Sequence, residues 1–189
     1  YKKEYQKNGI VIIDDFLPKD IYAKIVDIFD STQDFKQINQ VRKDRYELWN
    51  TSQDKRFPSS KETYENHFWT SQSIINDDYV LEVFDDYVKP LMIEIDGDNM
   101  GEILHQVTQM KNNGKDYFRC HYDDYMGTIG YILYFTKYHW KYDWGGLLQI
   151  STNEKIETIY PDPNRLVLIN HKLKTAHWIN PIQKYAKQY

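Results

Sequence analysis

Two histidines and one aspartate are the side chains of this chain best suited to chemistry. His121 and Asp123 are separated by one residue, and His177 follows near the end of the sequence. Side chains alternate along a β-strand, so a strand here would project His121 and Asp123 from the same face. Two imidazoles and one carboxylate can bind one face of an octahedral iron(II) and leave the opposite face open for substrates. The pattern therefore indicates a non-haem iron site.

The spacing of these residues is a weak signal by itself, because short motifs arise by chance. A buried sheet histidine with a backbone partner is the alternative that the spacing leaves open for His121. The remaining histidines are expected to be structural or exposed: His67 in a polar helix, His105 in a β-rich segment, and His139 and His171 in turns. The elements around the candidate ligands must therefore carry the interpretation.

The first half of the chain has mainly helical patterns. Residues 9–16 are β-branched and lie between Gly and Pro, which predicts a short buried strand. A helix beginning at Pro18 would place Ile21, Ile25 and Ile28 on one face. Further helices are predicted within 60–75 and over 77–95, the second kinked or split at Pro90. Residues 31–60 show no clear period and fit an irregular strand pair or a loop.

After Gly97 the segments become short, β-rich and separated by turn residues. We expect strands within 101–110, 116–123, 128–136, 145–151, 155–160, 165–170 and 175–180. The triplet from Asn112 to Gly114 predicts a hairpin between the first two. Short strands at this spacing favour a sandwich or barrel. We therefore predict one α+β domain over 1–189, in which helices and a lid within 1–100 pack on an antiparallel jelly-roll core within 101–189.

Composition narrows the class of protein. A hydrophobic content of 41% and an aromatic content of 16% argue against general disorder. The net charge of −4 gives no electrostatic reason to expect nucleic acid. One cysteine permits no internal disulfide, and no apolar run is long enough to span a bilayer, so we expect a cytoplasmic protein without a membrane partner. The first and last residues suggest a chain trimmed at both ends. Nothing in the sequence fixes the oligomeric state.

Several motifs of the second half occur together in one known family. They are Gly130–Phe135 (GYILYF), Trp140, the segment Trp144–Ile150 (WGGLLQI), the strand Asn164–Asn170, and Ala176–Ile182, in which Pro181 follows His177 by four residues. This arrangement resembles the iron(II)/2-oxoglutarate-dependent dioxygenases, and most closely their prolyl 4-hydroxylase-like branch. The resemblance covers about residues 101–189 well and 9–30 loosely.

The resemblance implies further site residues. His121, Asp123 and His177 correspond to the iron ligands, and the retained aspartate favours hydroxylation over the halogenation of relatives that lack it. Lys187 stands where the family has a cation for the distal carboxylate of 2-oxoglutarate, with Lys184 or a residue beyond Tyr189 as alternatives. Tyr134 matches a tyrosine that hydrogen-bonds this carboxylate. The resemblance also implies that Leu148 lines the co-substrate pocket.

The resemblance also implies an activity. Iron(II), 2-oxoglutarate and O2 would serve hydroxylation of a prolyl residue in a peptide or protein, with release of succinate and CO2 and with ascorbate as a candidate reductant. Residues 36–72 could form a lid over the substrate, and candidate substrate contacts are Arg42, Arg45, Tyr46, Trp49 and Trp178. One alternative is hydroxylation of a free amino acid or small metabolite. An alternative of another class is a jelly-roll binding module without catalysis.

Overall fold

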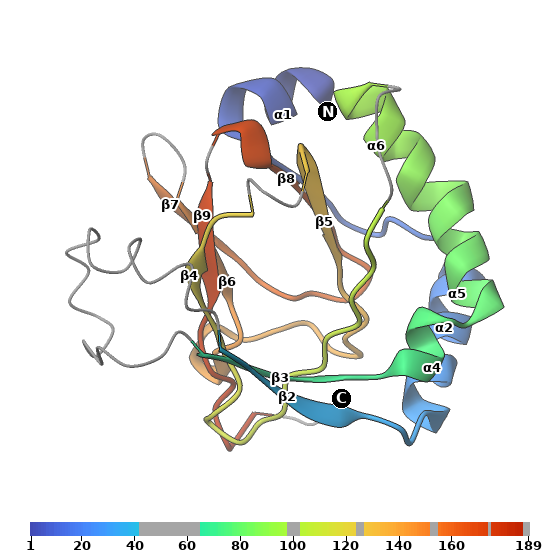
Figure 1. The fold of residues 1–189 in the computed structure, drawn as a ribbon, viewed down its shortest axis with the longest axis vertical. Coiled ribbons are helices and arrows are strands. Elements are labelled where there is room, and N and C mark those ends of the chain that lie inside the picture. Colours follow the sequence, from blue (N-terminus) through green and yellow to red (C-terminus); the bar gives the residue numbers. More distant parts are fainter. Residues whose placement is uncertain (42–64, 98–102, 124–126, 152–154, 174, 187–189) are drawn as a thin grey trace.

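The computed structural model describes residues 1–41, 65–97, 103–123, 127–151, 155–173 and 175–186. Two antiparallel sheets face each other at the centre of the molecule, and helices cover the outer face of one of them (Figure 1). A separate two-stranded sheet, β2–β3, lies across one end. The metal-ligand candidates therefore sit in a layered α+β structure.

The first sheet has the strand order β1-β8-β5. It consists of β1 (Ile10–Ile13), β8 (Leu166–Asn170) and β5 (Ile129–Leu133), all antiparallel to their neighbours. The central strand β8 is buried along its whole length, which explains its continuous apolar sequence. The predicted strands 9–16, 128–136 and 165–170 are confirmed in this sheet.

The second sheet has the order β4-β9-β6-β7. Its strands are β4 (Phe118–His121), β9 (Ala176–Ile179), β6 (Leu148–Ser151) and β7 (Ile156–Ile159). Leu148 and Ile150 of β6 pack against Val167 and Ile169 of β8, so the cores of the two sheets meet. The two sheets therefore pack face to face as a sandwich with an apolar core between them.

The helices form one layer on the β1-β8-β5 sheet (Figure 1). They are α1 (Lys2–Asn8), α2 (Lys19–Ser31), α4 (Gln72–Ile75), α5 (Asp78–Val83), the π-helical turn η2 (Phe84–Val88) and α6 (Lys89–Asp96). Pro90 has no N–H to donate to the preceding turn, and Lys89 instead donates to Phe84, five residues back. The predicted break at Pro90 thus appears as a π-helical turn. None of the helices in the described ranges is both long and apolar enough to cross a bilayer.

Two local predictions were wrong. Most of the helix expected within 60–75 is strand β3 (Glu65–Thr70), which pairs with β2 (Lys36–Val41), and only α4 is helical there. Residues 42–64 lie outside the described ranges. Asn66 and Phe68 are buried while the residues between and after them are not, and this period of two is a strand pattern that the mixed polar sequence obscured. His67 is accordingly a strand residue.

The segment 103–110 is also not a regular strand. Its burial alternates along an extended chain, but its only β-bridge in the described chain joins Gln109 to Trp69. The Asn112–Gly114 turn is present, and the chain after it bridges at Tyr117 to His67. Both limbs of the predicted hairpin therefore pair with β3 rather than with each other. Helix α1 was not anticipated from the sequence.

Candidate active site

Pairing of β4 with β9 places the candidate metal ligands together. His121 and His177 are direct partners in the register of these strands, and a β-bulge lies between Phe118 and His121. Bulges redirect the side chains that follow them and are common beside active sites. Asp123 comes two residues after His121, just beyond the end of β4. Residues far apart in the sequence thus meet at the end of one strand pair.

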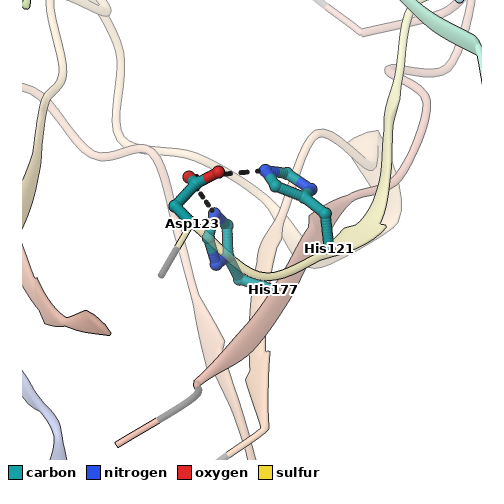
Figure 2. A group of neighbouring side chains, drawn as sticks. All are labelled: His121, Asp123 and His177. Atoms are coloured by element: carbon teal, nitrogen blue, oxygen red, sulfur yellow. Dashed lines mark ion pairs between the residues drawn. The ribbon is translucent and has the colours of Figure 1, made fainter. Parts of the chain in front are cut away.

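The three ligand groups converge on one point (Figure 2). One carboxylate oxygen, Asp123 Oδ2, lies 3.6 Å from His121 Nε2 and 3.3 Å from His177 Nε2. One ligand atom from each residue can be chosen so that all lie within 4.8 Å of one another, and the imidazole centroids are 4.2 Å apart. Two nitrogen donors and one oxygen donor at this spacing fit the facial donor set of non-haem iron(II).

Backbone carbonyls orient both imidazoles. His121 Nδ1 lies 2.6 Å from the carbonyl oxygen of Arg119, and His177 Nδ1 lies 3.2 Å from that of Thr175. A carbonyl only accepts, so each Nδ1 carries the proton and each Nε2 presents its lone pair toward Asp123. This outer contact fixes the tautomer that binds a metal. His121 is therefore a buried sheet histidine with a backbone partner, as the alternative interpretation had it. The same backbone contact is also the one that a metal-binding histidine needs.

Burial and mutual charge set the protonation of the site. Burial lowers the pKa of His121, and the neighbouring His177 lowers it further. Burial alone would raise the pKa of Asp123, but its interactions with the neighbouring imidazoles of His121 and His177 hold it well below its usual range. A neutral imidazole and an ionised carboxylate are the forms that bind a divalent cation. The electrostatics of the site therefore favour metal binding near neutral pH.

The three ligands open onto a cavity of about 720 Å³, which is within the usual range for small-molecule sites. Tyr134 and Leu148, the two residues expected beside 2-oxoglutarate, both line it. Leu148 is fully buried and packs in the core between the sheets. Its place in the cavity wall is consistent with an apolar contact to a co-substrate.

The hydroxyl of Tyr134 is the most informative polar group of the cavity. It is buried, and it has no hydrogen-bond partner among the described residues. Burial raises the pKa of this phenol, so the hydroxyl keeps its proton and can donate. Buried polar groups are almost always hydrogen-bonded, so this donor requires an acceptor from a water or a ligand in the cavity. A carboxylate oxygen would meet this need.

The Gly145–Gly146 pair permits a close approach of two loops. A side chain on Gly145 would place its Cβ 2.1 Å from the carbonyl oxygen of Pro181, and Gly145 has φ 71°. A Cβ on Gly146 would lie 2.7 Å from Cγ1 of Ile182. Only glycine tolerates both the positive φ and the contact. The turn before β6 is thereby packed against the segment that follows β9.

That segment, 180–186, is held on both sides. The N–H of Gln183 donates to Trp144, and the N–H of Gly114 donates to Ile182. Asn112 Nδ2 donates to the carbonyl oxygen of Ala186 at 2.9 Å. Lys187, the predicted carboxylate-binding cation, is the next residue and lies outside the described ranges. The alternative, Lys184, is exposed and does not line the cavity.

The predicted substrate contacts are mostly untested by the structure. Arg42, Arg45, Tyr46 and Trp49 lie outside the described residues. Trp178 stands on β9 between His177 and Ile179, which both line the cavity, whereas Trp178 does not. It points to the other face, where its register partner is Gln149. The structure therefore gives Trp178 no contact with the cavity.

Sequence reasoning missed two further histidines of the cavity wall. His171 is buried, and a Cβ on Gly130 would lie 2.5 Å from its Nε2, so the glycine makes room for the ring. His105 Nδ1 lies 2.6 Å from the hydroxyl of Tyr131. Both histidines line the cavity, although the sequence placed them in a turn and in an ordinary β-rich segment. No local motif marks either position, because the contacts come from distant residues.

Comparison with known proteins agrees with this geometry. Residues 105–189 match the family model of the 2OG-Fe(II) oxygenase superfamily. A prolyl hydroxylase from Trichoplax adhaerens, solved in complex with a hypoxia inducible factor oxygen degradation domain peptide fragment, shares 17% identity at a TM-score of 0.65, over 95% of this chain and 80% of that one. A prolyl-4-hydroxylase from Pseudomonas putida shares 14% identity at a TM-score of 0.56, over 96% of this chain and 90% of that one. No curated protein sequence matches this chain significantly.

The predicted α+β fold with a jelly-roll core is thus confirmed, since the chain shares its fold with solved oxygenases. The family match implies iron(II), 2-oxoglutarate and O2 as reactants, and the donor set of His121, Asp123 and His177 fits the metal. A binding module without catalysis is not supported. Residues 105–189 match the 2OG-Fe(II) oxygenase superfamily, and the chain shares the fold of two solved prolyl hydroxylases, which together support a 2-oxoglutarate-dependent dioxygenase.

Proposed function

We propose that this protein hydroxylates prolyl residues of a peptide or protein, using iron(II) bound by His121, Asp123 and His177. The observation that carries the proposal is the shared cavity of this triad and the unpartnered hydroxyl of Tyr134. A metal site and a carboxylate donor in one cavity fit a reaction that needs iron and a dicarboxylate together. We place 2-oxoglutarate between them.

The chain's residues would have separate tasks. Tyr134 would donate a hydrogen bond to the distal carboxylate of 2-oxoglutarate, and the ammonium group of Lys187 would neutralise its charge. Hydrogen bonds to an ionised carboxylate are stronger than those between neutral groups. Leu148 would exclude water beside the bound dicarboxylate. Bound iron(II) with 2-oxoglutarate and O2 supplies the oxidising power for hydroxylation of an unactivated C–H bond, with release of succinate and CO2.

The imidazoles and the carboxylate have fixed roles in this proposal. The backbone contacts of His121 and His177 keep both Nε2 atoms directed at the metal, which maintains one open coordination face. Asp123 would contribute the negatively charged oxygen ligand of this donor set. The protein therefore provides orientation and shielding, and its own side chains transfer no proton in this scheme.

The substrate is assigned from two kinds of support. The chain shares the fold of two prolyl hydroxylases, and one of them was solved with a bound peptide fragment. Arg42 and Trp49, which lie outside the described residues, stay candidate contacts to such a peptide. A free amino acid or small metabolite is the competing substrate class. A cytoplasmic location, supported by the single Cys120, is part of the proposal.

The test combines two products. The purified protein, loaded with iron(II), is incubated with 2-oxoglutarate and a library of proline-containing peptides, while free proline and other amino acids form a parallel arm. We expect a mass increase of about 16 Da on one peptide, since one oxygen atom enters each product. The amount of hydroxylated peptide should equal the amount of succinate formed. The Asp123→Ala variant should form neither product. Hydroxylation confined to the free amino acids would reject the peptide substrate.

A further inference from the structure

The cavity at the metal extends to both faces of strand β5. Ile132 and Tyr134 face the interior between the sheets, where they pack against the core that includes Leu148. Tyr131 and Leu133 face the helix layer and pack there against the cluster that includes Phe84. All of these residues line the same cavity. One continuous space therefore joins the metal triad to a second branch beneath the helices.

The cavity can pass around β5 because this strand is the edge of its sheet. The N–H of His171 donates to Thr128 and the N–H of Tyr134 to Arg165, so alternate residues of β5 bond to β8. The backbone groups of Ile129, Tyr131 and Leu133 consequently point to the other side, where the described chain provides no strand partner. Among the described residues, segment 103–109 contacts β5 through the His105–Tyr131 hydrogen bond but forms no ladder with it.

The helix-side branch is apolar. Its wall includes side chains from α2, α5, η2, α6 and β5: Ile25, Phe29, Val83, Phe84, Val88, Met92, Leu133 and Phe135. His105 and Tyr131, two polar residues at this branch, satisfy each other, because His105 Nδ1 and the hydroxyl of Tyr131 form a hydrogen bond of 2.6 Å. Burial lowers the pKa of His105, which keeps the ring neutral. The ion pair of Lys137 and Asp30 lies at the rim of the cavity.

Such a branch suits a small apolar molecule better than water or an ionic reactant. A buried water needs two to four polar partners, and apolar cavities instead take up apolar gases such as xenon. 2-Oxoglutarate and a peptide backbone are too polar for this wall. O2 is the apolar reactant of this enzyme class, and His121, Asp123 and His177 line the same cavity.

We propose that the helix-side branch, bounded by α2, α5, η2 and the open edge of β5, holds O2 and conducts it to the metal. The proposal rests on the proposed metal site only for the end of the route. The binding of an apolar gas in the branch is a property of the metal-free protein and is tested separately.

The first test uses xenon as the probe. Methyl spectra of metal-free protein are recorded under xenon pressure, and shifts are expected at Val83 and Leu133, which lie in the branch. The Val83→Phe variant fills the space and should lose the shift at Leu133. Val26→Phe, at the half-buried rim, is a second variant if the first does not fold. Ile156→Phe adds the same bulk at an exposed position outside the cavity. Shifts confined to Leu148, between the sheets, would overturn the proposal.

The second test measures dependence on O2. Val83→Phe or Val26→Phe should raise the KM for O2 about threefold or more, while the KM for 2-oxoglutarate and the rate at saturating O2 stay unchanged. If no peptide substrate is found, uncoupled turnover of 2-oxoglutarate gives the same constants. An unchanged KM for O2 in a variant that has lost its xenon shift would overturn the route. If the peptide screen fails, the xenon shifts and the KM for O2 can still be measured. The proposed O2 route and the proposed peptide substrate can therefore fail independently.

Discussion

Replacement of Tyr134 by Phe should change stability and co-substrate binding in opposite directions. The substitution removes one oxygen and keeps the ring, which packs with the core between the sheets. The hydroxyl is buried and has no hydrogen-bond partner among the described residues. The wild-type protein therefore carries a desolvated donor that serves no described contact, as expected for a group reserved for a ligand.

The expected changes in stability and in affinity follow from the hydroxyl without a ligand and with bound 2-oxoglutarate. A buried donor without a partner costs about 1–3 kcal/mol, so its removal should stabilise the ligand-free protein by about 1 kcal/mol. For a chain of this size, that gain corresponds to a rise in Tm of about 2–4 °C. A hydrogen bond to a charged carboxylate contributes about 1.5–3 kcal/mol, so 2-oxoglutarate should bind roughly 10- to 150-fold more weakly.

The assay is a thermal unfolding curve of the ligand-free protein together with a titration of 2-oxoglutarate into protein loaded with Mn²⁺. Tyr22→Phe is the matched control, because the hydroxyl of Tyr22 donates to the carbonyl oxygen of Thr136 at 2.5 Å. Loss of that bond should lower the Tm and leave 2-oxoglutarate affinity unchanged. A Tyr134→Phe protein that is less stable than wild type, or that binds 2-oxoglutarate equally well, would refute the assignment of Tyr134.

Further predictions concern the cavity wall, a surface ion pair and the metal. Gly130→Ala should destabilise the protein by about 1–3 kcal/mol, because the new Cβ meets His171 at 2.5 Å, and His171→Ala in the same chain should recover most of the loss in a double-mutant cycle. Burial alone would raise the pKa of Asp96, but hydrogen bonds from Lys172 and a threonine keep it lowered. Lys172→Met should therefore cost about 1 kcal/mol at neutral pH in urea unfolding, and this cost should shrink as the pH falls below about 4. Asp123→Asn should weaken Mn²⁺ binding by about 100-fold or more in a calorimetric titration. Loss of a group that only hydrogen-bonds to a metal ligand already costs about 10- to 100-fold in metal affinity. Binding equal to wild type would exclude Asp123 as a ligand.

Most of the sheet core follows from local sequence. The continuous apolar run of β8 and the alternation of buried residues on β6 predict buried strands. Both patterns can be recognised from neighbouring residues alone. Pro18 and the spacing of Ile21, Ile25 and Ile28 similarly predict α2. The pairing that brings His121 beside His177 could be expected only from the resemblance, because strand order depends on contacts between distant residues.

The remaining features depend on tertiary contacts that leave no local pattern. Strand β3 carries the mixed sequence ENHFWT, and it is a strand because β2 pairs with it and because Gln109 and Tyr117 bridge to its other edge. The segment 103–109 has the alternation of a strand but no ladder partner in the described chain. His171, just after β8, enters the cavity wall because Gly130 on β5 lacks a side chain. Such positions are set by packing rather than by propensity.

The central claim is that His121, Asp123 and His177 bind iron(II) and that 2-oxoglutarate binds beside it. The most direct measurement is the visible absorption of the protein after anaerobic addition of iron(II) and 2-oxoglutarate. We predict a weak charge-transfer band that requires both additions and disappears in His177→Ala. Correctly folded wild-type protein without this band, or a His177→Ala variant that retains it, would contradict the account.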